Sequence, residues 1–433
     1  MTTQGIMKLP QEWRLELADD ELRRVAVALH GEIERGLEGK KHRDLATLPA
    51  FVGMPRRSTR GKAVCLDVGG TLVRAAAVRV DGSELEVGEV KQALLPGVRE
   101  PVDRKAFFGV LAELVQPLLG RLRRIGFCFS YPAKILPDGD AVLLRWTKEV
   151  RAAGVEGTRV GKGLQEALRR LGRKGEMRVA VVNDTVTTLL AATRDPETEG
   201  CVGFVGLVVG TGTNMACFEP GTRAKSVPKT WRGLVAFNLE SGNFKGFPRG
   251  TLDERLAAET LDPDRQWFEK AVAGQYLGEL ARIALQDLVS RGKAPAELGT
   301  SAQELGPLTS RAMARILSGA SPESPWEEWL DDHPEALAVA RAVMRAVVER
   351  SARLVAAGLA CLVERAAHGA SRHGGEVAIA AEGSAFYGLP RYREIVEETL
   401  QRLTNVRFRI VRVPNANLKG AALAVLTQAD HRS

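Results

Sequence analysis

Aromatic residues, histidines and cysteines are scarce in this chain. Of 433 residues, 5% are aromatic, six are His and five are Cys. The cysteines are odd in number and far apart, and no Cys-x-x-Cys pair occurs, so the sequence indicates neither a disulfide framework nor a zinc finger. We expect no structural metal, a cytoplasmic location and reduced, mostly buried thiols at Cys65, Cys128, Cys201, Cys217 and Cys361.

Long apolar runs and blocks of one charge are also missing. The uncharged stretch at 201–218 is interrupted by glycines and reads as strands and a turn, so no membrane span is predicted. The 61 basic and 53 acidic residues are interspersed and leave a net charge of +8. The densest basic clusters, at 56–62 and 121–124, lack interleaved aromatics, so a nucleic-acid partner is not expected. The same charge would attract a small phosphorylated ligand.

The length of the chain suggests two or three domain-sized units, and the apolar pattern predicts both strands and helices. Two strand, turn, strand units lie about 140 residues apart, which suggests two related halves that face one another. The first unit comprises strands at 63–68 and 72–78, followed by a strand at 84–90, a helix at 103–119 and a strand that ends at Phe129. The second comprises strands at 202–209 and 214–218. The remaining expected elements are a turn-rich link at 47–61, helices at 19–39, 265–290, 309–318, 334–368, 390–403 and 418–427, and strands at 376–381 and 406–413.

Asn183 and Asp184 follow an apolar, β-branched strand and precede a helical pattern. A carboxylate at such a junction is held by backbone that is fixed on both sides, so Asp184 could act on a substrate hydroxyl. The alternative is that Asn183 or Asp184 only caps the helix by accepting from its first N–H groups. The residues alone support both interpretations equally.

Two turns rich in Gly and Thr could hold phosphate groups. Glycine permits positive φ and lets backbone N–H groups approach phosphate oxygens, and a Thr hydroxyl adds a donor. The turns, at 69–71 and 210–213, fit a nucleotide whose phosphates lie between two halves, although each alone could be a tight hairpin. Asp67, just before the first turn, would hold water around Mg²⁺ without direct coordination, or would only bond the backbone of its own turn.

Two other glycine motifs are discounted. Residues 157–163 resemble a P-loop but are one residue short and lack its final Ser or Thr, so we expect the start of a helix there. Residues 210–215 begin like a dinucleotide fingerprint but lack the third glycine and lead into a strand, which disfavours a nicotinamide cofactor.

Polar side chains gather at the ends of apolar segments. A sugar needs directional donors and acceptors around its hydroxyls, and these residue types supply them. The candidates are Ser130, Thr147, Lys148, Asn183, Asp184, Asn214, Glu240 and Glu269.

In content and order, these segments resemble the hexokinase family of sugar kinases over almost the whole chain. The matching segments are 66–71 with Arg74, 126–132, 144–148, 182–186, 209–214, 238–240, 266–270, 274–280, 382–385 and 419–422. The resemblance implies two actin-like (ribonuclease H-like) α/β domains of mixed sheet flanked by helices and separated by a substrate cleft. The small domain would comprise 62–183 and 418–433, and the large domain 1–61 and 184–417.

The resemblance also implies an ATP-dependent kinase for the 6-hydroxyl of glucose or a related hexose, acting with Mg²⁺ as a monomer or homodimer. Asp184 would be the general base. Ser130, Thr147, Lys148, Asn183, Asn214, Glu240 and Glu269 would hold the sugar. Gly69, Gly70, Thr71, Gly210, Thr211, Gly212 and Thr213 would face phosphates, with Gly383 and Ser384 on the adenosine side.

The chain departs from the family pattern at several positions. Leu72 stands where the family usually has Asn, Ser241 replaces the customary Trp, and the glycine before Lys419 is missing. Leu72 motivates an alternative function, a sugar-binding sensor of the same fold with weak catalysis. A sugar kinase or repressor of the ROK group is a less similar alternative, because its Cys-rich zinc motif is absent.

Overall fold

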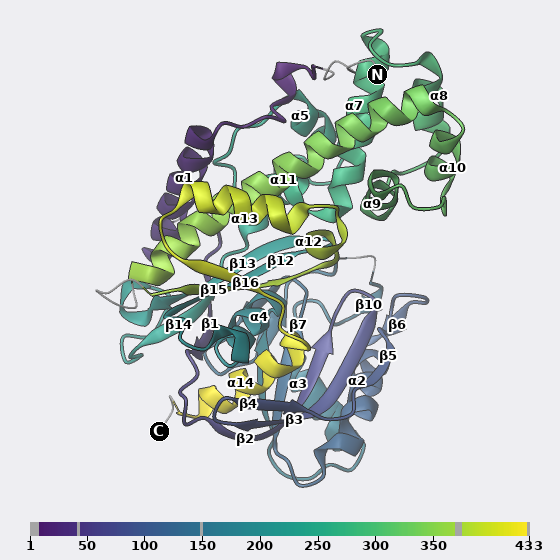
Figure 1. The fold of residues 1–433 in the computed structure, drawn as a ribbon. Helices are drawn as coiled ribbons and strands as arrows, with labels where there is room; N and C mark the ends of the chain where they lie inside the picture. The colour runs from purple at the N-terminus through teal and green to yellow at the C-terminus, as the bar shows by residue number, and fades with distance from the viewer. Residues whose placement is uncertain (1–7, 41–43, 148–149, 369–374, 431–433) are drawn as a thin grey trace.

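The computed structural model describes residues 8–40, 44–147, 150–368 and 375–430, which form two six-stranded mixed sheets (Figure 1). The first sheet contains β2 (Arg60–Val68), β3 (Leu72–Asp81), β4 (Glu84–Val87), β5 (Lys91–Leu94), β7 (Arg124–Phe129) and β11 (Arg178–Val182). The second contains β1 (Leu48–Gly53), β12 (Gly203–Val209), β13 (Thr213–Pro220), β14 (Leu234–Asn238), β15 (Val377–Glu382) and β16 (Phe408–Val411).

The two sheets share one scheme of strand pairing. In the first, β2 pairs antiparallel with β3 and parallel with β7, which continues in parallel to β11. In the second, β12 pairs antiparallel with β13 and parallel with β15, which continues in parallel to β16. The prediction of two related strand, turn, strand units, and with it the fold class of two mixed sheets flanked by helices, is therefore confirmed. How the chain divides into domains stays a prediction.

Two helices fill the space between the sheets (Figure 1). Helix α4 (Asp184–Ala192) packs against β12 and β15, whereas α14 (Ala416–Asp430) packs against β2 and β7, and the two helices pack against each other. Their approach is very close: a Cβ added at Gly420 of α14 would lie 2.0 Å from the carbonyl oxygen of Thr187 in α4. A larger side chain at this position would separate the helices.

The outer faces of the sheets are covered by separate sets of helices. Helix α2 packs on β2 and β3 of the first sheet, and α11 packs on β12 of the second, with α1 and α13 beside it (Figure 1). The bounds are α1 (Asp19–Leu37), α2 (Arg104–Leu119), α3 (Val160–Arg170), α5 (Thr251–Ala258), α6 (Trp267–Val272), α7 (Gly274–Ser290), α8 (Ala296–Glu304), α9 (Ser310–Ser318), α10 (Pro325–Asp331), α11 (Pro334–His368), α12 (Ser384–Gly388) and α13 (Tyr392–Leu403). Two small ladders pair β6 (Val102–Asp103) with β10 (Ala152–Ala153) and β8 (Ala133–Ile135) with β9 (Ala141–Leu143).

Most elements lie within a few residues of their predicted positions, and the long helix predicted at 334–368 is α11. The P-loop-like stretch runs into α3, and the 210–215 motif runs into β13, as expected. All five cysteines are unpaired, and Cys201 alone is not fully buried. No helix in the described ranges is long and apolar enough to cross a membrane.

Two predicted elements need correction. The link at 47–61 contains β1, which forms the edge of the second sheet by pairing with β14. Positive φ at Phe51, and at Thr47 just before the strand, interrupts the regular extended backbone, and the pairing with β14 shifts in register. The residues of β1 therefore do not alternate between apolar and polar as a regular strand would. The helix predicted at 265–290 is two helices, α6 and α7, because extended backbone at Ala273 lets the N–H of Gly274 donate to the carbonyl of Gly210 at 2.8 Å.

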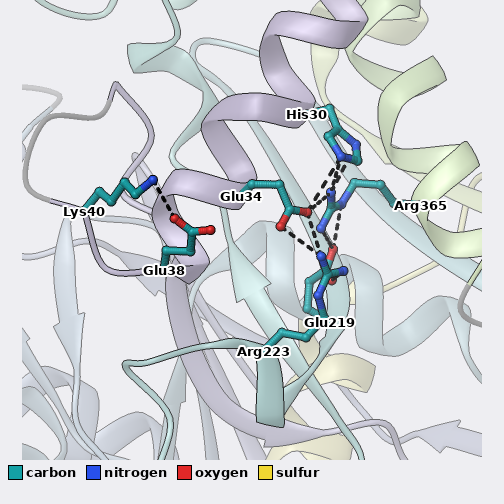
Figure 2. Close-up of polar contacts among 7 residues, drawn as sticks. All are labelled: His30, Glu34, Glu38, Lys40, Glu219, Arg223 and Arg365. Atoms are coloured by element: carbon teal, nitrogen blue, oxygen red, sulfur yellow. Dashed lines mark hydrogen bonds and ion pairs between the residues drawn. The ribbon is translucent and has the colours of Figure 1, made fainter.

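A buried ionic network joins α1, β13 and α11 (Figure 2). The guanidinium of Arg365 donates to Glu219 and to Glu34, each at 2.7 Å, while Arg223 donates to Glu34 at 2.9 Å. Burial disfavours the charge of Arg365, yet the two carboxylates raise its pKa. Burial would likewise raise the pKa of Glu34, but Arg365 and Arg223 lower it. His30 completes the cluster, and a separate pair joins Glu38 to Lys40 at 2.8 Å.

Replacing Arg365 by Met should cost roughly 3 kcal/mol in the free energy of unfolding, because it leaves the buried carboxylate of Glu219 without its main counter-charge. The side chain of Arg365 is 6% exposed. Arg24→Met is a matched control on α1, since the Arg24 side chain is 70% exposed and pairs with Asp20 at the surface. It should cost less than about 1 kcal/mol. Equal losses in chemical denaturation of the two variants would contradict this account of the network.

Candidate functional site

Two neighbouring cavities adjoin at Asp184. One has a volume of about 680 Å³, the other about 510 Å³, and Asp184 and Val208 line both. The predicted residues that line the larger cavity are Ser130, Thr147, Asn183, Asp184, Thr211, Gly212, Thr213, Asn214, Glu240 and Glu269. Gly383 lines the smaller one. Asp67, Gly69, Gly70, Thr71, Gly210 and Ser384 lie outside both linings, and Lys148 falls outside the described residues.

At the strand-to-helix junction, Asn183 and Asp184 have different roles: Asn183 caps the helix, and Asp184 lines the cavities. Asn183 is the N-cap of α4, and its side chain accepts from the N–H of Thr185 at 2.9 Å. Asp184 is the first helical residue and is half-buried, with one oxygen 2.8 Å from the same N–H. The hydroxyls of Thr187 and Thr188 donate to the backbone carbonyl of Asp184 and hold that residue in place. The helix therefore has its cap in Asn183, and the Asp184 side chain lines both cavities.

Amide and carboxyl side chains form a chain of hydrogen bonds beside the larger cavity, which Asn183, Asn214 and Glu240 line and behind which Asn238 is buried. The Nδ2 of Asn214 donates to Asn238 at 2.6 Å and lies 3.5 Å from the Oδ1 of Asn183. The Nδ2 of Asn238 donates to Glu240 at 2.7 Å. These bonds fix Glu240, whose backbone adopts a left-handed φ of 54°. Burial raises the pKa of Glu240; the Asn238 bond opposes this effect, and the charge of Asp184 adds to it.

Asn238 was missing from the predicted site. The sequence feature that could have identified Asn238 is the one that identified Asn183 and Asn214, an amide side chain at the end of an apolar strand.

The second Gly/Thr turn is tied to the helices that follow it. The carbonyls of Gly210 and Thr211 accept from the N–H groups of Gly274 and Gln275 at the start of α7. The N–H of Thr213 donates to the carboxylate of Glu269 at 3.0 Å, and the hydroxyl of Thr213 donates to the carbonyl of Val208. Glu269 therefore supports the turn as well as lining the cavity.

The turn that begins at Gly383 lies directly against this second Gly/Thr turn. Gly383 has a φ of 120°, and a Cβ there would come within 2.2 Å of the carbonyl oxygen of Val209. The residues expected on the adenosine side, Gly383 and Ser384, are thus packed beside Gly210.

Asp67 is held by side chains from a neighbouring strand and helix. Its carboxylate accepts from Arg74 at 2.6 and 3.1 Å and from the Nδ2 of Asn417 at 3.2 Å. Burial raises the pKa of Asp67, and the Arg74 charge counteracts part of that effect. These partners argue against the alternative in which Asp67 only bonds the backbone of its own turn. Asn417 also accepts from the hydroxyl of Thr187, so it connects α14 to both Asp67 and α4.

The first Gly/Thr turn sits at the end of β2 and β3. The N–H of Gly69 donates to the carbonyl of Leu72, and the hydroxyl of Tyr131 donates to the carbonyl of Gly69 at 2.8 Å. The contact of this turn with phosphates stays a prediction.

Several cavity residues were not predicted because their partners are distant in sequence. Arg145 and Asp262 form an ion pair at 3.2 Å between the segment after β9 and the loop before α6. Lys270 donates to the carbonyl of Asp262 at 2.6 Å, and burial lowers its pKa. No local spacing relates Arg145 to Asp262, which are 117 positions apart.

Solved structures with the same arrangement define the class of protein. The chain superimposes on a hexokinase from Schistosoma mansoni complexed with glucose with a TM-score of 0.78 and 25% identity, covering 95% of this chain and 96% of that one. A ROK hexokinase from Thermus thermophilus shares the fold, with a TM-score of 0.52, 19% identity, and 86% and 99% coverage. The fold is the actin-like fold of sugar kinases.

Sequence comparison narrows the class to one family. Two family models described as hexokinase match residues 11–193 and 204–427, and the chain belongs to the hexokinase family. Hexokinase-3 of Mus musculus is 31% identical over 424 residues, covering 92% of this chain and 45% of its own length. Hexokinase-2 of Homo sapiens is 29% identical over 450 residues, covering 94% and 47%. The chain therefore spans about half the length of the curated relatives it matches.

The assignment of the cap predicts different stabilities for two neighbouring variants. Asn183→Ala should lower the free energy of unfolding by about 1 kcal/mol, because it removes the side-chain oxygen that accepts at the start of α4. Asp184→Asn should cost less than about 0.5 kcal/mol, since an amide oxygen can still accept from Thr185. Denaturant titration measures both values. A larger loss for Asp184→Asn would show that Asp184 is needed mainly for the helix.

Proposed function

We propose that this protein transfers the γ-phosphoryl group of ATP to the 6-hydroxyl of glucose or a related hexose. The observation that carries the proposal is the position of Asp184 at the junction of two cavities. A carboxylate there can meet a hydroxyl presented from one cavity and a phosphoryl group presented from the other. In this role Asp184 accepts the hydroxyl proton as the oxygen attacks phosphorus.

The larger cavity suits a hexose. Ser130, Thr147, Asn183, Asn214, Glu240 and Glu269 bring hydroxyl, amide and carboxyl groups to its surface. Such groups bind a ring of hydroxyls by donating and accepting hydrogen bonds in fixed directions. The Schistosoma mansoni relative was solved with glucose, which supports a hexose as the substrate class. Turnover of glucose, mannose, fructose, glucosamine and N-acetylglucosamine, read as ADP formation, would rank them.

The smaller cavity suits the nucleotide. Gly383 and Arg412 line it, and the second Gly/Thr turn, which lines the adjoining larger cavity, packs directly against Gly383. Backbone N–H groups and a guanidinium favour phosphate oxygens. We assign Gly383 and Ser384 to the adenosine side and both Gly/Thr turns, with Gly69, Gly70, Thr71, Gly210, Thr211, Gly212 and Thr213, to the phosphates.

The carboxylates near Asp184 suit Mg²⁺. Asp67 and Asp184 are near enough that the charge of Asp184 contributes to raising the pKa of Asp67. Oxygen ligands and retained water are what Mg²⁺ prefers, so Asp67 would hold the ion through water. When bound, Mg²⁺ neutralises charge that builds on the phosphoryl oxygens. Asp184 then needs only to orient the hydroxyl and take its proton.

Water must be kept from the phosphoryl group, because water is also a hydroxyl nucleophile. The Arg145–Asp262 ion pair spans two segments that line the larger cavity, one after β9 and one before α6. Approach of these segments after sugar binding would close that cavity over the substrate.

Asp184→Ala should lower kcat by about 10²–10⁴, the range for loss of a general base, with sugar binding changed only a few-fold. A coupled ADP assay measures turnover, and calorimetry measures glucose binding. Asp195→Asn is the control, because Asp195 caps a short 3-10 helix away from both cavities. Turnover of Asp184→Ala near that of the unaltered protein would refute the assignment.

The same pair of measurements addresses the sensor alternative, which rests on Leu72, 43% exposed beside the first turn. Glucose binding by the unaltered protein with no ADP formation would favour the sensor.

The raised pKa of Glu240 predicts that sugar affinity falls as the pH drops from neutral toward 5. A carboxyl group with a raised pKa takes up its proton at a higher pH than an exposed Glu, and it then loses its strength as an acceptor from a sugar hydroxyl. Glu240→Gln should bind glucose roughly tenfold more weakly at neutral pH, with little dependence on pH. Calorimetry from pH 5 to 8 measures this.

The control for this experiment is Glu259→Gln. Glu259 also lines the larger cavity, but it pairs with Arg282 and is half exposed. That variant should keep the pH dependence of the unaltered protein. An unchanged pH profile in Glu240→Gln would contradict the role of Glu240.

A further inference from the structure

A third cavity lies at the opposite end of the first sheet from Asp184. It has a volume of about 650 Å³ and is bordered by α3 and by the starts of β7 and β11. Strand β11 begins in this cavity with Arg178 and ends at Val182, immediately before Asn183 and Asp184. Five residues of strand span roughly 15 Å, so the two sites are separate.

The acidic residues of this cavity are largely committed to structure. Asp140 accepts from the N–H groups of Gly161 and Lys162 at 2.7 and 3.0 Å, so it satisfies the start of α3. Asp140 also pairs with Arg159 at 2.9 Å, and Asp138 pairs with the same guanidinium. Both carboxylates and Arg159 thus form one cluster, in which Asp140 is buried and Asp138 and Arg159 reach the surface.

Within the described residues, no ion pair engages the remaining basic side chains of this cavity. Arg123, Arg124, Lys162, Arg169 and Arg178 line the cavity, and none of them forms an ion pair within the described part of the chain. Glu176 is the one acidic lining residue outside the cluster, and the cluster itself carries a net charge of −1, so the six basic and three acidic lining residues leave a net charge of +3. Like charges gathered at one concave surface repel one another and create a local positive potential.

This combination of shape and charge favours a small anion of high charge. The volume lies in the range of small-molecule sites, and a hollow of this kind is a poor match to a flat membrane surface. The lining has no aromatic side chain on which a base could stack, which disfavours single-stranded nucleic acid. Arginine forks bind phosphate oxygens in pairs, which suits a ligand with several phosphate groups.

We propose that this cavity binds a small molecule that carries two or more phosphate groups, at a site distinct from the cavities around Asp184. Arg169 on α3 and Arg178 on β11 face it from two elements and would bind its phosphate oxygens. The proposal does not depend on the kinase activity, because the charges and the cavity are independent of Asp184.

The probe is inorganic tripolyphosphate, titrated calorimetrically into the full chain at low ionic strength. The cavity variant Arg169→Ser with Arg178→Ser should bind it at least about tenfold more weakly, because two charged contacts are lost. The control variant is Arg121→Ser with Arg170→Ser. It removes the same charge from exposed positions next to Arg169 and close to Arg123, outside the cavity lining. It should bind less than about threefold more weakly, the effect of net charge alone.

Two results would overturn the proposal: no binding by the unaltered protein, or equal weakening in the two double variants. The second result would assign the binding to a site other than this cavity. Circular dichroism of both variants verifies that they fold, which is expected because all four side chains are exposed. A difference of tenfold against threefold between the two double variants supports the site.

Discussion

The close packing of α4 between the two sheets is the constraint on which the candidate site depends. On one side, a Cβ at Gly206 of β12 would lie 2.5 Å from the carbonyl oxygen of Thr185; on the other, a Cβ at Gly420 would lie 2.0 Å from that of Thr187. Backbone thus meets backbone on both sides of the first turn of α4. A helix held in this way cannot shift without moving both sheets, so Asp184 at its start has a fixed position relative to both cavities.

The apolar pattern of the sequence predicted those strands and helices whose burial follows a regular spacing along the chain. The apolar runs of β2, β7, β11 and β12 and the long period of α11 are visible in the sequence, as is the junction at Asn183 and Asp184. The choice between cap and catalytic carboxylate was not visible, because both residue types cap helices well. The structure shows that Asn183 is the N-cap and that Asp184 lines both cavities, while the catalytic role of Asp184 stays a proposal.

The features that sequence reasoning missed depend on partners far along the chain. The strand β1 depends on pairing with β14, and the break between α6 and α7 depends on the carbonyl of Gly210. Asn417 lies 350 positions from Asp67, to which it donates. Each of these features depends on a hydrogen bond between segments far apart in the sequence. Such a bond can outweigh local propensity, and the periodicity of apolar residues does not reveal it.

The two Gly/Thr turns resemble each other in sequence but differ in what holds them. The second turn is fixed by α6, α7 and Gly383 and lines a cavity, whereas the first is held by Tyr131 and by pairing within its own sheet. The first turn belongs to the sheet that carries Ser130 and the segment of Arg145 and Thr147; the second belongs to the opposite sheet. The proposed phosphoryl transfer therefore requires the first sheet to approach the second, because phosphates held at Gly212 would otherwise lack donors from Gly70 and Thr71. In the proposed function, a rotation about the packed pair of α4 and α14 would produce this approach, and Asp184 at the start of α4 would lie near the axis, where displacement is smallest.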